Sequence, residues 1–149
     1  MKAHQTETSP NVPNGPPDGM PANVKWRLIT ACALFLVSLL LPGLELADGN
    51  SVEGWRILLV GWYGFIALEF PWIANLFFMA GIIAGWSGYH RRAGILGCAA
   101  ALAGLLSLRS NIWIANHVPI DHLGSGFYVW MIGFITLATL MVGTRKAPI

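Results

Sequence analysis

Residues 71–108 read PWIANLFFMAGIIAGWSGYHRRAGILGCAAALAGLLSL, which is two apolar runs on either side of the basic triplet 90–92. A hydrocarbon core about 30 Å thick needs about 20 residues of helix, and each run approaches that length. The stretch therefore predicts two membrane-spanning helices, at about 71–89 and 93–108. Pro71 suits the first turn of a helix, where its missing N–H costs nothing.

Two further apolar runs lie outside this stretch and predict spans at about 26–44 and 126–143. The composition agrees, because 55% of the 149 residues are hydrophobic and only 11% are charged, whereas a soluble domain carries about 25% charged residues. We predict an all-α integral membrane protein with four transmembrane helices. Pro42 and Gly43 are expected to end the first of them.

Three segments do not form spans in this prediction. Residues 1–24 contain five prolines and no apolar period, which predicts a disordered cytoplasmic tail; residues 25–149 then form a single domain. Residues 45–53 are expected to be an acidic, polar connection. The apolar segment 55–68 is too short to cross, which predicts a re-entrant or interfacial helix on the outer side, with a tilted span as the alternative.

Basic residues set the orientation of the chain. With one crossing between residues 54 and 89, seven Lys and Arg share one side and two share the other, so the positive-inside rule makes the first side cytoplasmic. Both termini are then cytoplasmic, and the chain belongs in a cell membrane, the bacterial inner membrane. The seven are Lys2, Lys25, Arg27, Arg91, Arg92, Arg145 and Lys146, and the two are Arg56 and Arg109.

Small residues spaced along the second and third predicted spans indicate close helix packing. Gly81 and Gly85 lie four apart, as do small residues near Gly97 and Gly104. Helices in lipid associate through such close backbone approach. We expect these two helices to pack as a hairpin, although the same faces could bind a helix of a partner.

Glu69 is the only acid in an apolar stretch of some thirty residues. Ionisable groups at membrane depth are costly and are usually paired or functional. Arg109 should lie at a similar depth, so an ion pair is the favoured interpretation. The alternatives are an interfacial carboxylate in water and an ion or proton site in the chain break at Glu69–Pro71.

The loop before the last predicted span carries His117, Asp121 and His122, whose side chains are of the type that binds zinc or copper. Their spacing matches no recognised metal pattern, and Pro119 prevents a regular helix from presenting them on one face. A polar loop that caps helix ends is the simpler interpretation. No motif in the chain predicts a cofactor or a nucleic-acid site.

The sequence therefore favours a small, non-enzymatic structural or accessory subunit, associated with lipid and with itself or a larger membrane complex. Two alternatives stay open. One is a small oligomeric channel or transporter that uses the Glu69–Pro71 break. The other is a metal-binding membrane enzyme that uses the outer loop.

Overall fold

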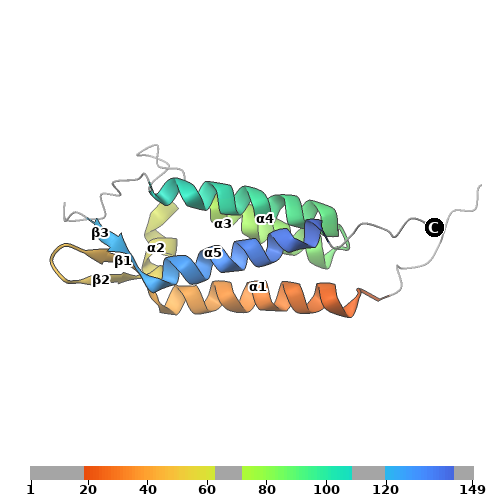
Figure 1. The fold of residues 1–149 in the computed structure, drawn as a ribbon, viewed down its shortest axis with the longest axis horizontal. Coiled ribbons are helices and arrows are strands. Elements are labelled where there is room, and N and C mark those ends of the chain that lie inside the picture. The colour runs from red at the N-terminus through yellow and green to blue at the C-terminus, as the bar shows by residue number, and fades with distance from the viewer. Residues whose placement is uncertain (1–18, 63–71, 109–119, 143–149) are drawn as a thin grey trace, which may run out of the picture.

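The computed structural model describes residues 19–62, 72–108 and 120–142. Within these ranges the long helices lie lengthwise beside one another and form a bundle (Figure 1); they are α1 (Ala22–Leu40), α3 (Ile73–Trp86), α4 (His90–Leu105) and α5 (Ser125–Ala138). Short 3₁₀ turns extend α4 and α5, namely η2 (Leu106–Leu108) and η3 (Thr139–Met141). At one end of the bundle lie a short helix, α2 (Gly54–Val60), and three strands, β1 (Pro42–Leu46), β2 (Ser51–Glu53) and β3 (Ile120–Leu123).

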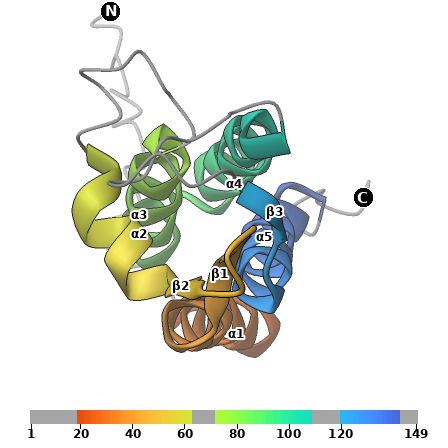
Figure 2. The same ribbon diagram turned by 90° about the vertical axis from the view of Figure 1, so that its left-hand side faces the viewer.

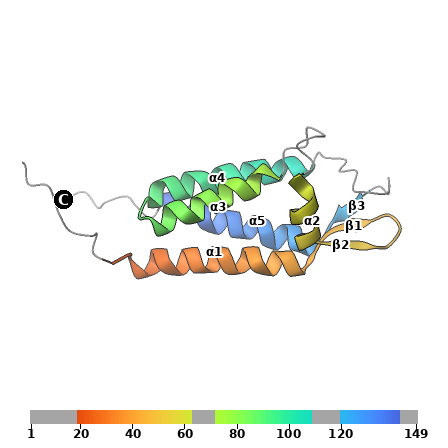
Figure 3. The same cartoon turned by 180° about the vertical axis from the view of Figure 1, so that it is seen from behind.

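The helices follow one another around the bundle in the order α1, α5, α4, α3, as the end view in Figure 2 shows. α1 and α4 run in one direction, while α3 and α5 run in the other (Figure 1). α2 lies across the sheet end, near the start of α3 (Figure 3). There the indole N–H of Trp72 donates a hydrogen bond of 2.9 Å to the carbonyl oxygen of Leu58, which joins these two elements.

Aromatic rings pack against one another at the centre of the bundle. Phe78 of α3 lies between Phe35 of α1 and Phe134 of α5, with ring centroids 4.9 and 5.1 Å apart. Each ring buries a large apolar area and prefers such offset contacts. Around them pack smaller buried side chains from all four long helices, including Leu28, Ala31, Ala74, Ala93, Ala100, Leu137 and Leu140.

The prediction of four transmembrane helices is wrong. Among the described residues only α1, with 19 residues, is long and apolar enough to cross a membrane. Such a helix near the N-terminus also occurs as a signal sequence or as a core helix of a soluble protein. The all-α class is wrong as well, because the described chain includes a three-stranded antiparallel sheet in the order β2-β1-β3.

Helix ends explain why two of the predicted spans, 71–89 and 126–143, were too long. α3 has 14 residues, which is about 21 Å of helix at 1.5 Å per residue. It stops because Gly88 adopts a φ of +84° and the N–H of Tyr89 turns back to the carbonyl of Ala84 at 2.8 Å. α5 also has 14 residues before it tightens into η3. The prediction counted apolar residues, and several of these lie in turns.

The sheet forms where a polar connection was expected, at residues 45–53. β1 and β2 make a hairpin whose turn has Gly49 at a φ of +83°. The Asp48 carboxylate accepts hydrogen bonds from the backbone and side-chain N–H groups of Asn50 at 3.0 and 2.8 Å. This short-range bonding is typical of Asp in turns and closes the hairpin locally. β3 then pairs with the other edge of β1.

The remaining segments can be compared only in part. α1 begins at Ala22, so the last residues of the predicted tail are helical; residues 1–18 lie outside the described ranges. α2 occupies the first part of the predicted outer segment 55–68, and its later residues are not described. α1 ends at Leu40, just before Pro42, as expected for a residue that lacks an N–H.

Candidate functional site

Charged residues of the described chain gather at the two ends of the bundle. The end that holds the α3–α4 turn is basic, and the sheet end is mostly acidic. No Asp, Glu, Lys, Arg or His occurs in residues 28–44, 57–62, 72–89, 93–108 or 123–142. The bundle therefore has an uncharged belt between two charged ends. The basic end carries Lys25, Arg27, His90, Arg91 and Arg92, and the sheet end carries Glu45, Asp48, Glu53, Arg56, Asp121 and His122.

The sheet places His122 between two carboxylates. Glu45 and His122 are paired residues of β1 and β3, and the His122 Nε2 atom lies 2.8 Å from Oε2 of Glu45. The other ring nitrogen, Nδ1, lies 2.9 Å from Oδ2 of Asp121. The hydrogen bond to Asp121 and the attraction of Glu45 together raise the pKa of His122 above its usual 6.5. An imidazolium that donates to both carboxylates satisfies this geometry.

Of the predicted metal ligands, the structure describes Asp121 and His122, and it pairs them with each other. A metal ion needs a free lone pair on one imidazole nitrogen, whereas both nitrogens of His122 face carboxylate oxygens. Within the described ranges no group of three or more His, Cys, Asp and Glu side chains could hold a metal ion. His117 lies outside those ranges. The sequence did not predict the role of Glu45, because only strand register brings it to His122.

The predicted ionisable pair falls outside the structural description, since neither Glu69 nor Arg109 belongs to the described residues. The same holds for the Glu69–Pro71 break. Arg56 forms an ion pair with Glu53 one helical turn away, at 3.0 Å between Nε and Oε2. Its guanidinium also lies 5.3 Å from the ring centroid of Trp55.

The predicted packing glycines lie inside the bundle. A Cβ atom added to Gly81 would meet Leu137 at 2.8 Å and Leu96 at 3.2 Å, and one added to Gly85 would meet Leu28 at 2.6 Å. On α4, Gly97 faces the backbone of Ala138 and Gly104 faces Met131 and Trp130, so both contact α5. α3 and α4 do form an antiparallel hairpin. The glycine-containing faces of α3 and α4 therefore already pack against other helices of the same chain.

Large apolar side chains cover the outer surface of the belt. Leu40 on α1 is 78% exposed, Leu102 on α4 is 67% exposed and Ile83 on α3 is 64% exposed. α5 adds Ile132 and Ile135. Soluble monomers rarely leave contiguous apolar patches larger than a few hundred Å² in contact with water. An apolar surface present on every long helix is typical of a protein that contacts lipid or other apolar partners.

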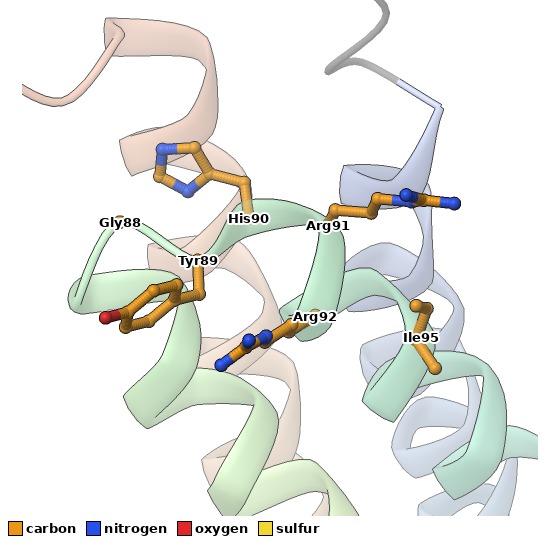
Figure 4. A pocket seen from close by; sticks show the side chains of 6 residues that line it. All are labelled: Gly88, Tyr89, His90, Arg91, Arg92 and Ile95. Atoms are coloured by element: carbon orange, nitrogen blue, oxygen red, sulfur yellow. The ribbon is translucent and has the colours of Figure 1, made fainter.

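A depression of about 560 Å³ opens at the basic end (Figure 4). It lies at the α3–α4 turn and is lined by Gly88, Tyr89, His90, Arg91, Arg92 and Ile95. The guanidinium of Arg92 lies 5.0 Å from the centroid of the Tyr89 ring, a cation–π contact that positions the charge without neutralising it. Nearby at the same end, Arg27 donates a 3.1 Å hydrogen bond to the carbonyl oxygen of Thr139.

Comparison of the chain with protein-family models, with curated proteins and with solved structures finds no match. The function is therefore argued from the surface and the charge distribution of this chain.

Proposed function

We propose that the protein is a small, non-enzymatic membrane protein that acts as an accessory or structural subunit. In this proposal α1 crosses the bilayer and the uncharged belt of the bundle contacts lipid. The single observation that carries it is the belt itself, which separates a basic end from an acidic end and exposes apolar side chains on every long helix. The proposal assigns the crossing to α1 alone; the other long helices are shorter or less apolar, and they pack with it in one bundle.

The charge distribution supports an orientation for this membrane protein. The basic end carries Lys25, Arg27, Arg91 and Arg92, whereas Arg56 is the only Lys or Arg that the described chain places at the sheet end. Lys and Arg are enriched on the cytoplasmic side of membrane proteins. We therefore propose that the start of α1, with Lys25 and Arg27, faces the cytoplasm and that Asp48, beyond the other end of α1, lies on the opposite side.

Polar groups inside the bundle favour a structural role over a catalytic one. The indole N–H of Trp130 donates a 2.9 Å hydrogen bond to the side-chain oxygen of buried Asn75. The buried hydroxyl of Ser38 donates a 2.6 Å bond to the carbonyl of Phe35. Both groups are engaged in bonds that tie helices together or satisfy a helical carbonyl. A partner subunit would contact the outer apolar side chains, since the glycine faces are already occupied.

Membrane residence is tested by extraction and by cysteine labelling. In a Cys32→Ser/Cys98→Ser background, single variants Asp48→Cys and Lys25→Cys place a thiol at each end. We expect the protein to stay in the pellet after alkaline carbonate treatment. A membrane-impermeant maleimide should label Asp48→Cys in intact cells and Lys25→Cys only after permeabilisation. Release by carbonate, or equal labelling of both thiols in intact cells, contradicts the proposal.

The subunit role is tested by purification from native membranes in mild detergent, followed by mass spectrometry of the co-purifying proteins. A stoichiometric membrane-protein partner or a stable homo-oligomer is expected. A protein that runs only as a monomer under these conditions contradicts an accessory role, while leaving membrane residence to the labelling experiment.

A further inference from the structure

We propose that the depression at the α3–α4 turn binds the phosphate of an anionic phospholipid headgroup, held by Arg91 and Arg92. This inference rests on the proposed membrane residence and adds a specific ligand to it. The depression lies where the uncharged belt meets the basic end, which is the depth of the headgroups for a bundle embedded in lipid.

The arginines are available for an anion. Both side chains are exposed, and neither forms an ion pair with a carboxylate in the part of the chain that the structure describes. Arg92 is positioned by the Tyr89 ring, and Figure 4 shows its side chain directed toward that ring, whereas the Arg91 side chain extends in the opposite direction. Both side chains are flexible, and binding of one phosphate by both requires Arg91 to turn toward the depression. Guanidinium groups bind phosphate through two parallel N–H donors, which gives both charge and geometry.

The local backbone adds to this positive potential. α4 begins at His90, and its first turn contains no acidic residue and has no side-chain cap. The unbonded N–H groups of a helix start carry a partial positive charge that favours an anion. His90 also lines the depression, and its Nδ1 atom is buried without a hydrogen-bond partner among the described residues. The site thus combines a recess, a helix start and two guanidinium groups that have no carboxylate partner among the described residues.

Aromatic side chains at this end of the belt suit a lipid ligand better than a free anion. Trp86 is 49% exposed and Tyr89 is 55% exposed, and both lie at the end of the belt. Trp and Tyr rings prefer the headgroup level, where one part of the ring meets hydrocarbon and the other meets water. Ile95, 46% exposed on α4, extends an apolar wall from the depression into the belt, where an acyl chain would continue.

The test measures lipid binding by the full-length protein in dodecyl maltoside micelles, with native mass spectrometry as the readout. The probes are phosphatidylglycerol, phosphatidylcholine and inorganic phosphate. Wild type should retain phosphatidylglycerol in preference to phosphatidylcholine. Arg91→Gln/Arg92→Gln should bind it about 25-fold more weakly, since each basic group near an anionic surface contributes about fivefold. Both positions are exposed, so this variant should fold.

The matched control is Lys25→Gln/Arg56→Gln, which removes two positive charges elsewhere and should keep most of the affinity. The assigned site is wrong if the control loses as much affinity for phosphatidylglycerol as Arg91→Gln/Arg92→Gln, or if Arg91→Gln/Arg92→Gln keeps full affinity. Competition by millimolar inorganic phosphate overturns the lipid assignment and makes the ligand a free anion. Carbonate extraction of Arg91→Gln/Arg92→Gln separates the two proposals, because the variant should remain in the membrane fraction even where the headgroup site fails.

Discussion

The protonated side chain of His122, on β3, links this strand to β1 through a contact with a carboxylate. Its ring nitrogens contact Glu45 on β1 and Asp121 on β3, and the hydrogen bond to Asp121 is the main cause of its raised pKa. A histidine whose pKa is higher in the folded state stabilises that state fully below its unfolded pKa, near 6.5. The stabilisation is lost as the pH rises through the higher folded value. The β1–β3 pairing should therefore be strongest at mildly acidic pH.

Asp121→Asn should lower the pKa of His122 toward 6.5, because it replaces a charged acceptor by a neutral amide. The measurement is an NMR titration of the His122 ring proton in wild type and variant. Asp48→Asn is the control, since the Asp48 carboxylate bonds Asn50 in the turn. An unchanged His122 titration in Asp121→Asn would show that the observed contact does not form in solution.

At Gly97 the backbones of α4 and α5 approach each other so closely that only a hydrogen side chain fits. A Cβ at this position would lie 2.5 Å from the backbone nitrogen of Ala138. Gly97→Val should therefore push α4 from α5 and destabilise the protein by about 1–3 kcal/mol. Leu102→Val, on the exposed face of the same helix, should change stability by less than about 0.5 kcal/mol. Unfolding by denaturant in detergent micelles measures both, and equal effects would contradict the assigned α4–α5 contact.

At the scale of elements, α3 and α5 are joined by one buried polar contact. The Trp130 indole N–H bonds the Asn75 side chain at 2.9 Å, and Trp130 also packs on Phe134 with centroids 4.3 Å apart. A buried polar group that loses its hydrogen-bond partner destabilises the folded protein by about 1–3 kcal/mol, because the group stays out of water. The bond therefore contributes to the stability of the α3–α5 contact.

Trp130→Phe should destabilise the protein by about 1–3 kcal/mol, because Asn75 stays buried without its donor. In a double-mutant cycle, Asn75→Leu should cost much less when Trp130→Phe is already present. Trp86→Phe, a half-exposed tryptophan on α3, is the control and should be nearly neutral. Strictly additive effects of the two substitutions would contradict a direct Asn75–Trp130 bond.

The elements were predictable to different degrees. The helix at residues 73–86 lies inside the predicted range 71–89, because a long apolar run and the basic turn mark it locally. The sheet was missed, although Leu44, Glu45 and Leu46 alternate before the turn residues Asp48 and Gly49, a pattern that is typical of a hairpin. The pairing of β1 with β3 has no local signal, since the partners are more than seventy residues apart.

At the scale of the whole molecule, charge is confined to the ends of the bundle and apolar side chains cover the region between them. Ile132 lies near the middle of α5 and is 51% exposed, while Val142 lies at the basic end and is 74% exposed. In water both positions would tolerate lysine with little change. In lipid, a lysine at the centre of the belt costs about 2.5–3.5 kcal/mol.

Ile132→Lys should therefore reduce the amount of protein in the membrane fraction, and Val142→Lys should not, because its ammonium group reaches the headgroups. The measurement is quantitative immunoblotting of carbonate-washed membranes after matched expression. The two lysines add the same charge to exposed positions near α5, so net charge cannot explain a difference. Equal membrane levels for both variants would mean that the belt faces water.

The sequence by itself determined where the helices lie, which end of the bundle is basic and which stretches carry no charge, since these depend on residue type and spacing along the chain. Only the tertiary structure decided how long each helix is, because turns such as Gly88 and the 3₁₀ segment after α5 end helices within apolar runs. It also decided that Gly97 faces α5 and that Glu45 meets His122. Such contacts join residues distant in sequence, and their geometry follows from packing the whole bundle.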